Sequence, residues 1–446
     1  MSDRRQFRIR LTTTHVIMLS FLGAILIGTI LLALPISSAK ESAVPFIDAL
    51  FTATSACCVT GLVTLTTADT WSGFGQAVIL FLIQIGGLGI VTILYGVMIG
   101  IHRKMGIGAR MLLLDAFNLN SLSGIIGFTK KVILGTLIVE GIGALLCMLV
   151  FVPEYGPRGI WISVFHAISA FCNAGMDVIG ADSLCTYVTN PLINLVTMLL
   201  IILGGLGFIV WWDVLRARCF RRLTLHSKLA ITATGVLLIA GTLGYLVFEW
   251  NNPATLGEYS GMNKLMAAAF QSVTVRTAGF ATIAQEKFKD SSVLLSMVLM
   301  FIGGSPVGTA GGVKNVTMLV VFACALATIR NNEDVNLFHR VVPKNIVMKA
   351  IAVISVAFAV VFCSTLLLSA VTGADLIDVM YETVSAAATV GLSRGLTGEL
   401  NLPGKLIIIV TMYLGRIGPI SLAVAFSTKK AKANRIKNPS EQISVG

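Results

Sequence analysis

The amino-acid sequence predicts an all-α polytopic membrane protein made of four tandem repeats, and three observations lead to this class. Hydrophobic residues make up 56% of the 446 residues and charged residues only 12%, whereas a typical soluble domain carries about 25% charge. Long apolar segments recur along the chain, and glycine-marked motifs recur in register four times. This composition excludes a soluble enzyme, a disordered regulator and a disulfide-stabilised scaffold.

Each repeat begins with a long apolar helix, the first near residues 16–34, which is too long for the apolar region of a signal peptide. A short stretch rich in Ala, Ser and Thr follows, then a glycine, then a second long apolar helix. The short stretches have 12 to 14 residues, too few to span roughly 30 Å of hydrocarbon. We therefore expect re-entrant helices that enter and leave on one side, at Phe46–Cys57, Gly159–Cys172, Gly261–Val273 and Ala374–Ala387.

Alignment on the glycine after each short stretch supports the repetition. The four glycines are 104 to 114 residues apart, and a second glycine marker follows each of them 24 to 29 residues later. The first set is Gly61, Gly175, Gly279 and Gly391, and the second is Gly86, Gly204, Gly303 and Gly415. Six residues before the first set stand Ser55, Ser169, Val273 and Ser385. This register divides the chain into repeats at 1–104, 105–222, 223–340 and 341–430, with a tail at 431–446.

Basic residues indicate the orientation of the repeats. Most of the 33 lysines and arginines fall in the N-terminal segment, the three connections between repeats and the tail. These five regions share one side if each repeat crosses the membrane twice, and the positive-inside rule makes that side cytoplasmic. Both termini are therefore expected in the cytoplasm. Because topology accounts for the net charge of +12, no nucleic-acid partner is expected. Acidic residues flank the short stretches, and a mouth of one sign concentrates cations.

The segments that end at the four glycines form the candidate ion site. Glycine permits backbone angles that point successive carbonyl groups at an axis, and such carbonyls replace the water shell of an alkali cation. The C-terminal dipoles of four short helices also favour a cation. The predicted selectivity filter consists of Val59, Thr60, Gly61, Asn173, Ala174, Gly175, Thr277, Ala278, Gly279, Thr389, Val390 and Gly391.

The third repeat departs from the others in its second long helix. Five glycines and a proline lie within residues 303–312, which cannot hold a regular helix. An apolar helix resumes afterwards, so a flexible loop is expected at membrane depth, directly below the filter. This position favours a gate, with a packed kink as the alternative. The candidate gate residues in the loop are Gly303, Gly304, Ser305, Gly308, Thr309, Gly311 and Gly312.

Three basic residues near these segments call for partners. Arg416 replaces the second glycine of the marker in the fourth repeat, and a charge inside a membrane helix costs at least a few kcal/mol. It precedes Lys430 by 14 residues, roughly 20 Å of helix, too far to snorkel. We expect it to face the pore against the loop, as part of the gate. Lys314 is expected to reach cytoplasmic water, and Arg276 to pair with Glu382.

Four repeats of this kind resemble the Trk/Ktr/HKT potassium-transporter superfamily, and the length resembles the membrane subunit of bacterial Ktr systems. The resemblance implies four M1–P–M2 (helix, pore helix, helix) repeats around one pseudo-fourfold pore. It implies channel-like uptake of K⁺, with K⁺ as substrate at the filter carbonyls and Na⁺ as activator, and an intramembrane gate at 303–312. The implied setting is a bacterial cell membrane. The implied partners are a second copy of the chain and a cytosolic ring of nucleotide-binding RCK/KTN-type subunits, which alone would bind ATP/ADP or NAD(H).

Two other classes of function remain to be weighed. An alternating-access secondary transporter is the alternative, although such proteins are usually built from two inverted or parallel halves. An intramembrane enzyme would need a Ser/His, paired-Asp or His-Glu-x-x-His constellation, and the sequence has none, so no catalytic residue is expected. The eight cysteines contain no C-x-x-C and the histidines no metal-ligand spacing. No cofactor, and no metal other than K⁺, is therefore expected on this chain.

Overall fold

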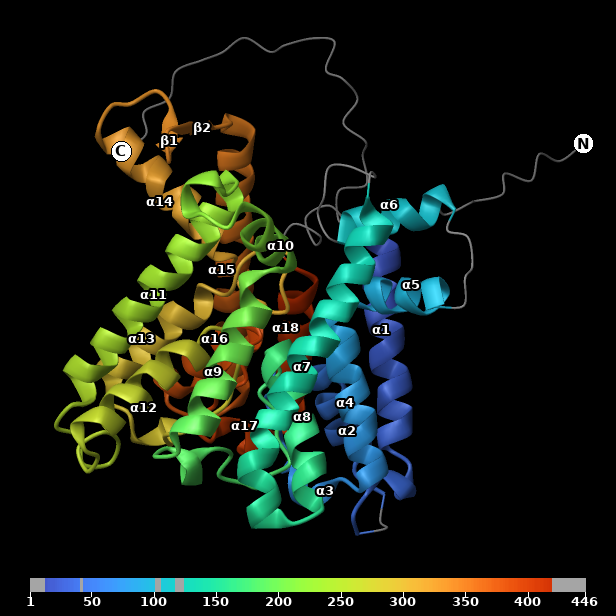
Figure 1. Cartoon of the computed structure of the whole chain (residues 1–446). Helices are drawn as coiled ribbons and strands as arrows, with labels where there is room; N and C mark the ends of the chain where they lie inside the picture. The colour runs from blue at the N-terminus through green and yellow to red at the C-terminus, as the bar shows by residue number, and fades with distance from the viewer. Residues whose placement is uncertain (1–12, 41–42, 101–105, 117–123, 419–446) are drawn as a thin grey trace, which may run out of the picture.

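A computed structural model of the chain describes residues 13–40, 43–100, 106–116 and 124–418, which are almost entirely helical (Figure 1). Four of the described helices are long and apolar enough to cross a membrane, and the number rises to six if each of two bent helix pairs is one span. The four long helices are α1 (Thr13–Leu32), α7 (Ile125–Tyr155), α11 (Leu225–Glu249) and α15 (Lys344–Val371).

A short helix follows each long one, close to the predicted bounds. These short helices are α2 (Phe46–Cys58), α8 (Arg158–Cys172), α12 (Gly261–Thr274) and α16 (Leu376–Ala388). A residue with left-handed backbone angles ends three of them, with φ of 57° at Val59, 61° at Asn173 and 53° at Thr389. In the third, the left-handed residue is Thr277, at φ 69°. This conformation stops a helix, so the chain turns away at the start of each predicted filter segment.

The second long helices are broken, where the sequence analysis expected a break only in the third repeat. In the first repeat α4 (Gly73–Leu88) turns by 99° into α5 (Ile90–Gly100), and in the second α9 (Pro191–Leu206) turns by 94° into α10 (Phe208–Ala217). The hinges are Gly89 and Gly207, with φ of 82° and 88°. Such angles are easy for glycine and end the helix. Helix α18 (Leu402–Ile417), the last in the described part of the chain, also stops at a positive-φ glycine, Gly418.

The third repeat is broken as predicted. Helix α13 (Asp290–Phe301) and helix α14 (Asn315–Ile329) are separated by residues 302–314. We call this segment the gate loop, after the role that the sequence predicts for residues 303–312 within it. A single bridge between Ile302 and Val313 ties the two ends of the loop together. The two ends of the gate loop therefore lie next to each other, and the residues between them form a closed loop.

Smaller elements connect these helices. A hairpin of β1 (Val335–Leu337) and β2 (Arg340–Val342) follows α14, so the all-α prediction misses a short β-structure. Its turn uses Phe338 and His339 with φ of 49° and 61°, as a two-residue turn of this twist requires. Neither is the Asn or Gly that marks such turns. The other short helices are α3 (Thr67–Thr70), α6 (Ile107–Ala116) and α17 (Leu396–Glu399), with single 3₁₀ turns at Pro35–Ser37, Cys185–Tyr187, Phe220–Arg222 and Gln285–Lys287.

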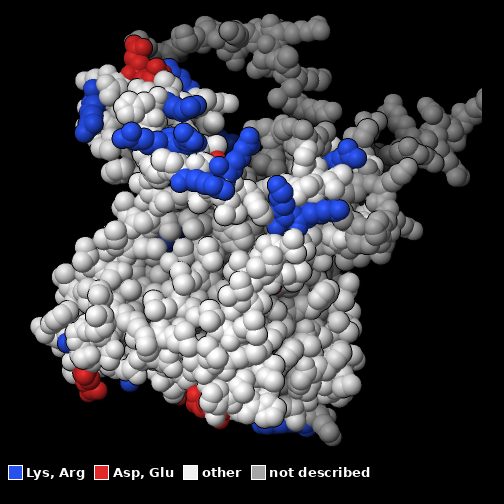
Figure 2. All heavy atoms as spheres, in the orientation of Figure 1, with Lys and Arg blue, Asp and Glu red and all other residues white. Residues whose placement is uncertain are grey.

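Charged side chains separate toward the two ends of the helical body. On the face drawn in Figure 2, Lys and Arg gather at the end that carries α10 and the hairpin, and Asp and Glu lie at both ends, with a few basic residues at the opposite end. The wide band between them is almost free of charge, as contact with hydrocarbon requires. The predicted basic residues in the N-terminal segment, at Arg103 and Lys104, and in the tail lie outside the described residues.

Candidate functional site

The four predicted glycines meet in a closed ring. A Cβ atom added to Gly61 would lie 3.2 Å from the Cα atom of Gly175, and one on Gly175 would lie 2.8 Å from that of Gly279. A Cβ atom added to Gly279 would lie 3.4 Å from the Cα atom of Gly391, and one on Gly391 would lie 2.8 Å from that of Gly61. The repeats therefore follow one another around the ring in sequence order, and the last meets the first.

Backbone oxygens fill the spaces between neighbouring segments of the ring. A Cβ on Gly61 would lie 2.5 Å from the carbonyl oxygen of Ala174, and one on Gly175 would lie 2.6 Å from that of Ala278. All four glycines also have positive φ, between 66° and 99°. Both facts require glycine, and both bring carbonyl oxygens of the predicted filter residues to the ring.

A buried hydroxyl group on each short helix fixes the segment that follows it. The serine hydroxyls of α2 and α16 accept the backbone N–H groups of Gly61 at 3.0 Å and Gly391 at 3.1 Å. In the other two repeats the hydroxyl donates to the carbonyl of the residue after the glycine, at 2.6 and 2.7 Å. The four anchors are Ser55, Ser169, Thr274 and Ser385.

The anchor of the third repeat is a residue that the sequence alignment missed. Val273 occupies the aligned position, but Thr274, one residue later, provides the hydroxyl. The shift goes with the geometry of α12, whose chain continues through two more residues before the left-handed turn at Thr277. The sequence did offer a sign of this anchor, because the aligned position holds the apolar Val273 and the next residue, Thr274, carries a hydroxyl group.

Three threonine hydroxyls in the ring segments are buried and have no hydrogen-bond partner in the described chain. They belong to Thr60, Thr277 and Thr389, each 0% exposed. Buried polar atoms are nearly always satisfied, so three orphaned oxygens beside a ring of carbonyls are unusual. Neutral oxygen atoms are the ligands that hard cations prefer. The donor set around the ring therefore fits a weakly bound alkali cation.

The gate loop is bonded to the second glycine marker of the second repeat. Ser305 donates its backbone N–H to the carbonyl of Gly205 at 2.8 Å, and Thr309 donates to that of Gly204 at 3.1 Å. The Thr309 hydroxyl also donates to the carbonyl of Phe171, near the end of α8, at 3.0 Å. The marker glycines thus provide carbonyl groups to which the loop bonds, a role that the repeat pattern did not predict.

Two cationic side chains bond to carbonyl groups of the gate loop. Arg416 on α18 donates from Nη1 to the carbonyl of Thr309 at 2.8 Å and from Nη2 to the carbonyl of Gly86. Lys314, the last residue of the loop, donates within it to the carbonyl of Ala310 at 2.5 Å, whereas the sequence predicted that it would reach water. The gate loop is therefore connected to the first, second and fourth repeats.

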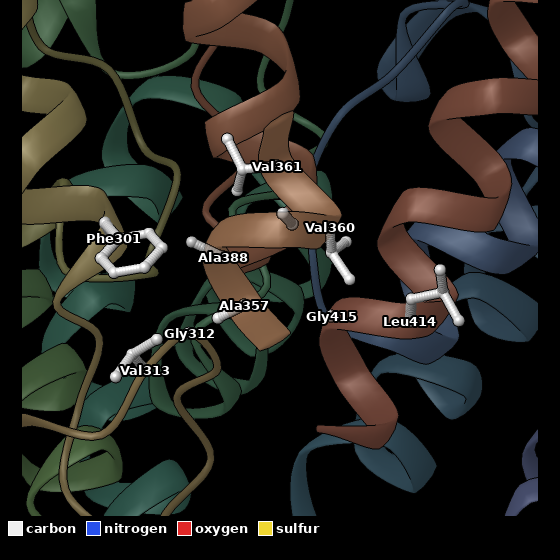
Figure 3. A pocket seen from close by; sticks show the side chains of 10 residues that line it. Phe301, Gly312, Val313, Ala357, Val360, Val361, Ala388, Leu414 and Gly415 are labelled. Carbon is white, nitrogen blue, oxygen red and sulfur yellow. The ribbon is translucent and has the colours of Figure 1, made fainter. Parts of the chain in front are cut away.

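The gate loop also touches the ring itself. A Cβ on Gly311 would lie 3.0 Å from the carbonyl oxygen of Ala388, the last residue of α16. Beside this contact is an apolar pocket lined by residues of the loop, α13, α15, α16 and α18 (Figure 3). Its lining includes Val313, Val360 and Leu414 and offers a cation no charged ligand.

The predicted pair of Arg276 and Glu382 does not form. Glu382 instead accepts the hydroxyls of Ser393, at 2.8 Å, and Thr397, so the chain just after its own filter segment takes up the carboxylate. Arg276 donates to Thr234 Oγ1.

Two of the acidic groups near the short helices are neutralised. Asp48 pairs with Lys405, and Asp378 with Arg394, each at 2.6 Å. These pairs make the mouth less acidic than the sequence predicts. The first of them also joins the first repeat to the last, because α2 carries Asp48 and α18 carries Lys405.

Comparison with known proteins places this geometry in a family. The family model of the cation transport protein TrkH matches residues 3–436. The chain is 39% identical to the Ktr system potassium uptake protein B of Bacillus subtilis (strain 168), covering 98% of each protein. It is also 39% identical to the potassium/sodium uptake protein NtpJ of Enterococcus hirae, covering 99% of each. The crystal structure of the potassium transporter TrkH from Vibrio parahaemolyticus aligns with a TM-score of 0.76 at 18% identity, over 96% of this chain and 87% of that one.

The match over nearly the full length agrees with the resemblance drawn from the repeated glycines, and the fold agrees with that of a solved member. The chain belongs to the TrkH family of cation transport proteins.

Proposed function

We propose that this chain is the membrane subunit of a K⁺ uptake system and conducts K⁺ through one pore made by four M1–P–M2 repeats. The observation that carries the proposal is the closed ring of Gly61, Gly175, Gly279 and Gly391, with carbonyl oxygens between its segments. Relatives of similar length that are named as potassium or potassium/sodium uptake proteins support K⁺ as the substrate. Na⁺ is assigned the role of activator.

The mechanism begins with dehydration of the ion at the ring. Carbonyl oxygens of the filter segments replace part of the hydration shell, and they do so without a formal charge that would trap the ion. The unpartnered hydroxyls of Thr60, Thr277 and Thr389 add neutral oxygens nearby. Four short helices end at the ring, and their C-terminal dipoles make the site more favourable for a cation than bulk hydrocarbon.

A channel-like mode is favoured over alternating access by the arrangement of the ring and loop. Every repeat contributes one segment to a closed ring, so exposing the site alternately would require the ring itself to separate. The gate loop is held mainly by hydrogen bonds to carbonyl groups of other elements, at Gly204, Gly205 and Phe171. A movement of this loop alone would open or close the path. We therefore assign gating to residues 303–312 and Arg416.

Transport assays with purified protein in liposomes test the function. The expected result is Rb⁺ uptake that is competed by K⁺ much more strongly than by Na⁺, and that continues when no Na⁺ gradient is present. Absence of Rb⁺ flux, or flux that K⁺ does not compete, would overturn the assignment. Uphill K⁺ accumulation driven by a Na⁺ gradient in fixed proportion would instead establish the alternating-access alternative.

The basic end of the protein is proposed to be cytoplasmic and to dock a ring of nucleotide-binding regulatory subunits, with two copies of this chain per complex. The nucleotide, ATP/ADP or NAD(H), binds only to that ring. Exposed arginines on the connections around α10 and the hairpin, Arg221, Arg222, Arg330 and Arg340, form a surface that suits an acidic partner.

Replacing these four arginines by Glu is expected to weaken partner binding by about tenfold or more. Each charge at the rim of an interface contributes only a little binding free energy, but the four contributions add up. Binding of the purified partner ring to detergent-solubilised protein measures the change. Reversing Arg158 and Lys287, which are exposed at the opposite end, is the matched control and leaves binding unchanged. Equal binding by both variants would mean that the basic face reflects membrane topology alone.

A further inference from the structure

A buried arginine lies directly before the third filter segment. Arg276 precedes Thr277 in the chain and is only 7% exposed. Within the described residues, its side chain makes a single hydrogen bond, from Nη2 to Thr234 Oγ1 on α11 at 3.4 Å, and its Nε atom has no partner. Neither of the two ion pairs in the described chain involves it. Burying a guanidinium group with so few hydrogen bonds costs free energy. We therefore expect its one hydrogen bond, to Thr234, to have a strong influence on the position of the Arg276 side chain.

Thr234 connects this arginine to the gate loop. Its Oγ1 atom also accepts the Nδ2 group of Asn315, the first residue of α14, at 3.1 Å. The same Asn315 amide donates to Ser305 Oγ in the loop at 3.0 Å, and the Asn315 backbone N–H donates to the carbonyl of Gly304. All four side chains are at most 7% exposed. We call Arg276, Thr234, Asn315 and Ser305 the polar relay.

The polar relay exists only in the repeat that carries the gate loop. Three residues before the ring glycine, the position of Arg276, the other repeats have Cys58, Cys172 and Ala388, which are small and uncharged. A small cavity borders Arg276, Thr234 and Gly304, so the guanidinium is not tightly packed on its side toward the loop. A contiguous hydrogen-bonded network of this kind can carry energetic coupling between two sites.

We propose that Thr234 is a positioning residue for ion selectivity, which sets the third filter segment through Arg276 according to the position of the gate loop. When Asn315 and Ser305 move with the loop, Thr234 transmits the movement to the guanidinium and hence to the backbone at Thr277. The filter then selects K⁺ most strongly in one loop position. This inference rests on the proposed function, because it needs a conducting, selective ring.

Thr234→Val tests the relay, because valine keeps the shape of threonine and removes the hydroxyl. The expected results are a fall of about fivefold in the preference for K⁺ over Na⁺ and a rise in flux without the partner ring, because a hydrogen bond as long as 3.4 Å contributes no more than one of ordinary strength. Thr234→Ser keeps the hydroxyl and restores both. Thr242→Val, on the same helix, removes a hydroxyl that donates only to the Leu238 carbonyl, and both quantities stay at the wild-type level.

Asn315→Ala breaks the relay from the loop side and is expected to lower K⁺ preference in the same direction. Combined with Thr234→Val it adds little further, because both changes cut one path. Wild-type selectivity and wild-type flux without the partner in either single variant would overturn the proposal, as would full additivity of the two. Wild-type protein in the same liposomes separates this outcome from failure of the proposed function: if wild-type conducts K⁺ selectively, only the relay is refuted.

Discussion

Replacing Gly279 by serine is expected to remove most of the preference for K⁺ over Na⁺, by about tenfold to a hundredfold, while the protein still inserts and folds. The new Cβ atom would meet the carbonyl oxygen of Val390 and lie 3.0 Å from the Cα atom of Gly175. Gly279 also has φ of 84°, where a side chain costs about 1–3 kcal/mol. The neighbouring segments must move apart, and their carbonyls then no longer match the size of K⁺. Competition of Rb⁺ uptake by K⁺ and by Na⁺ measures the loss.

Gly141→Ser is the matched control for this substitution. Gly141 lies in α7, has ordinary helical angles and has open space where a Cβ would be added. The same chemical change there leaves selectivity and uptake at the wild-type level. If Gly279→Ser kept the wild-type ion preference and affinity, the ring would not be the selective element.

Shortening the gate loop by removing residues 305–311 is expected to give the largest rise in flux without the partner ring. The deletion removes the contacts with Gly204, Gly205 and Phe171 that hold the loop below the ring. Arg416→Gln has a milder effect of the same sign, because it removes one charge and weakens the bonds to Thr309 and Gly86. A bond to a charged group contributes about 1.5–3 kcal/mol, so an increase of about tenfold or more is expected for Arg416→Gln. Liposome flux with and without the partner ring measures both.

Arg158→Gln makes the same change at an exposed position at the start of α8, outside the surface proposed to dock the partner ring, and serves as the control. Its flux without the partner equals that of wild-type protein. Low flux after deletion of the loop would show that the narrowest point of the path lies elsewhere and that residues 303–312 only connect two helices.

Sequence patterns predicted the elements that depend on local chemistry. The short helix predicted at Phe46–Cys57 ends one residue later, at Cys58. Its length could be predicted because the stretch rich in Ala, Ser and Thr is short and a glycine follows it. The break at 303–312 was visible because five glycines and a proline cannot remain helical. Arg416 stood out because a charge in hydrocarbon is rare and needs a partner, although the pattern did not reveal which carbonyls it meets.

Features that depend on contacts between repeats were missed. The bends at Gly89 and Gly207 were not predicted, because a glycine in an apolar helix can serve close packing or a bend, and only the neighbouring elements decide which. Arg276 was assigned to Glu382 because both lie near a filter segment, but the carboxylate is taken up locally by Ser393 and Thr397. A charge and its partner can be matched from sequence only when their helices are already placed.

A nascent chain that has released only its first three repeats has no complete ring, and therefore no selective path for ions. Gly391 closes the ring against Gly61, and the fourth repeat brings Lys405 to Asp48 and the hydroxyl of Tyr413 to the carbonyl of Met18. These contacts join the end of synthesis to its beginning. Membrane insertion of the first helices can thus proceed before any pore exists, and premature termination yields a protein that lacks the closing segment.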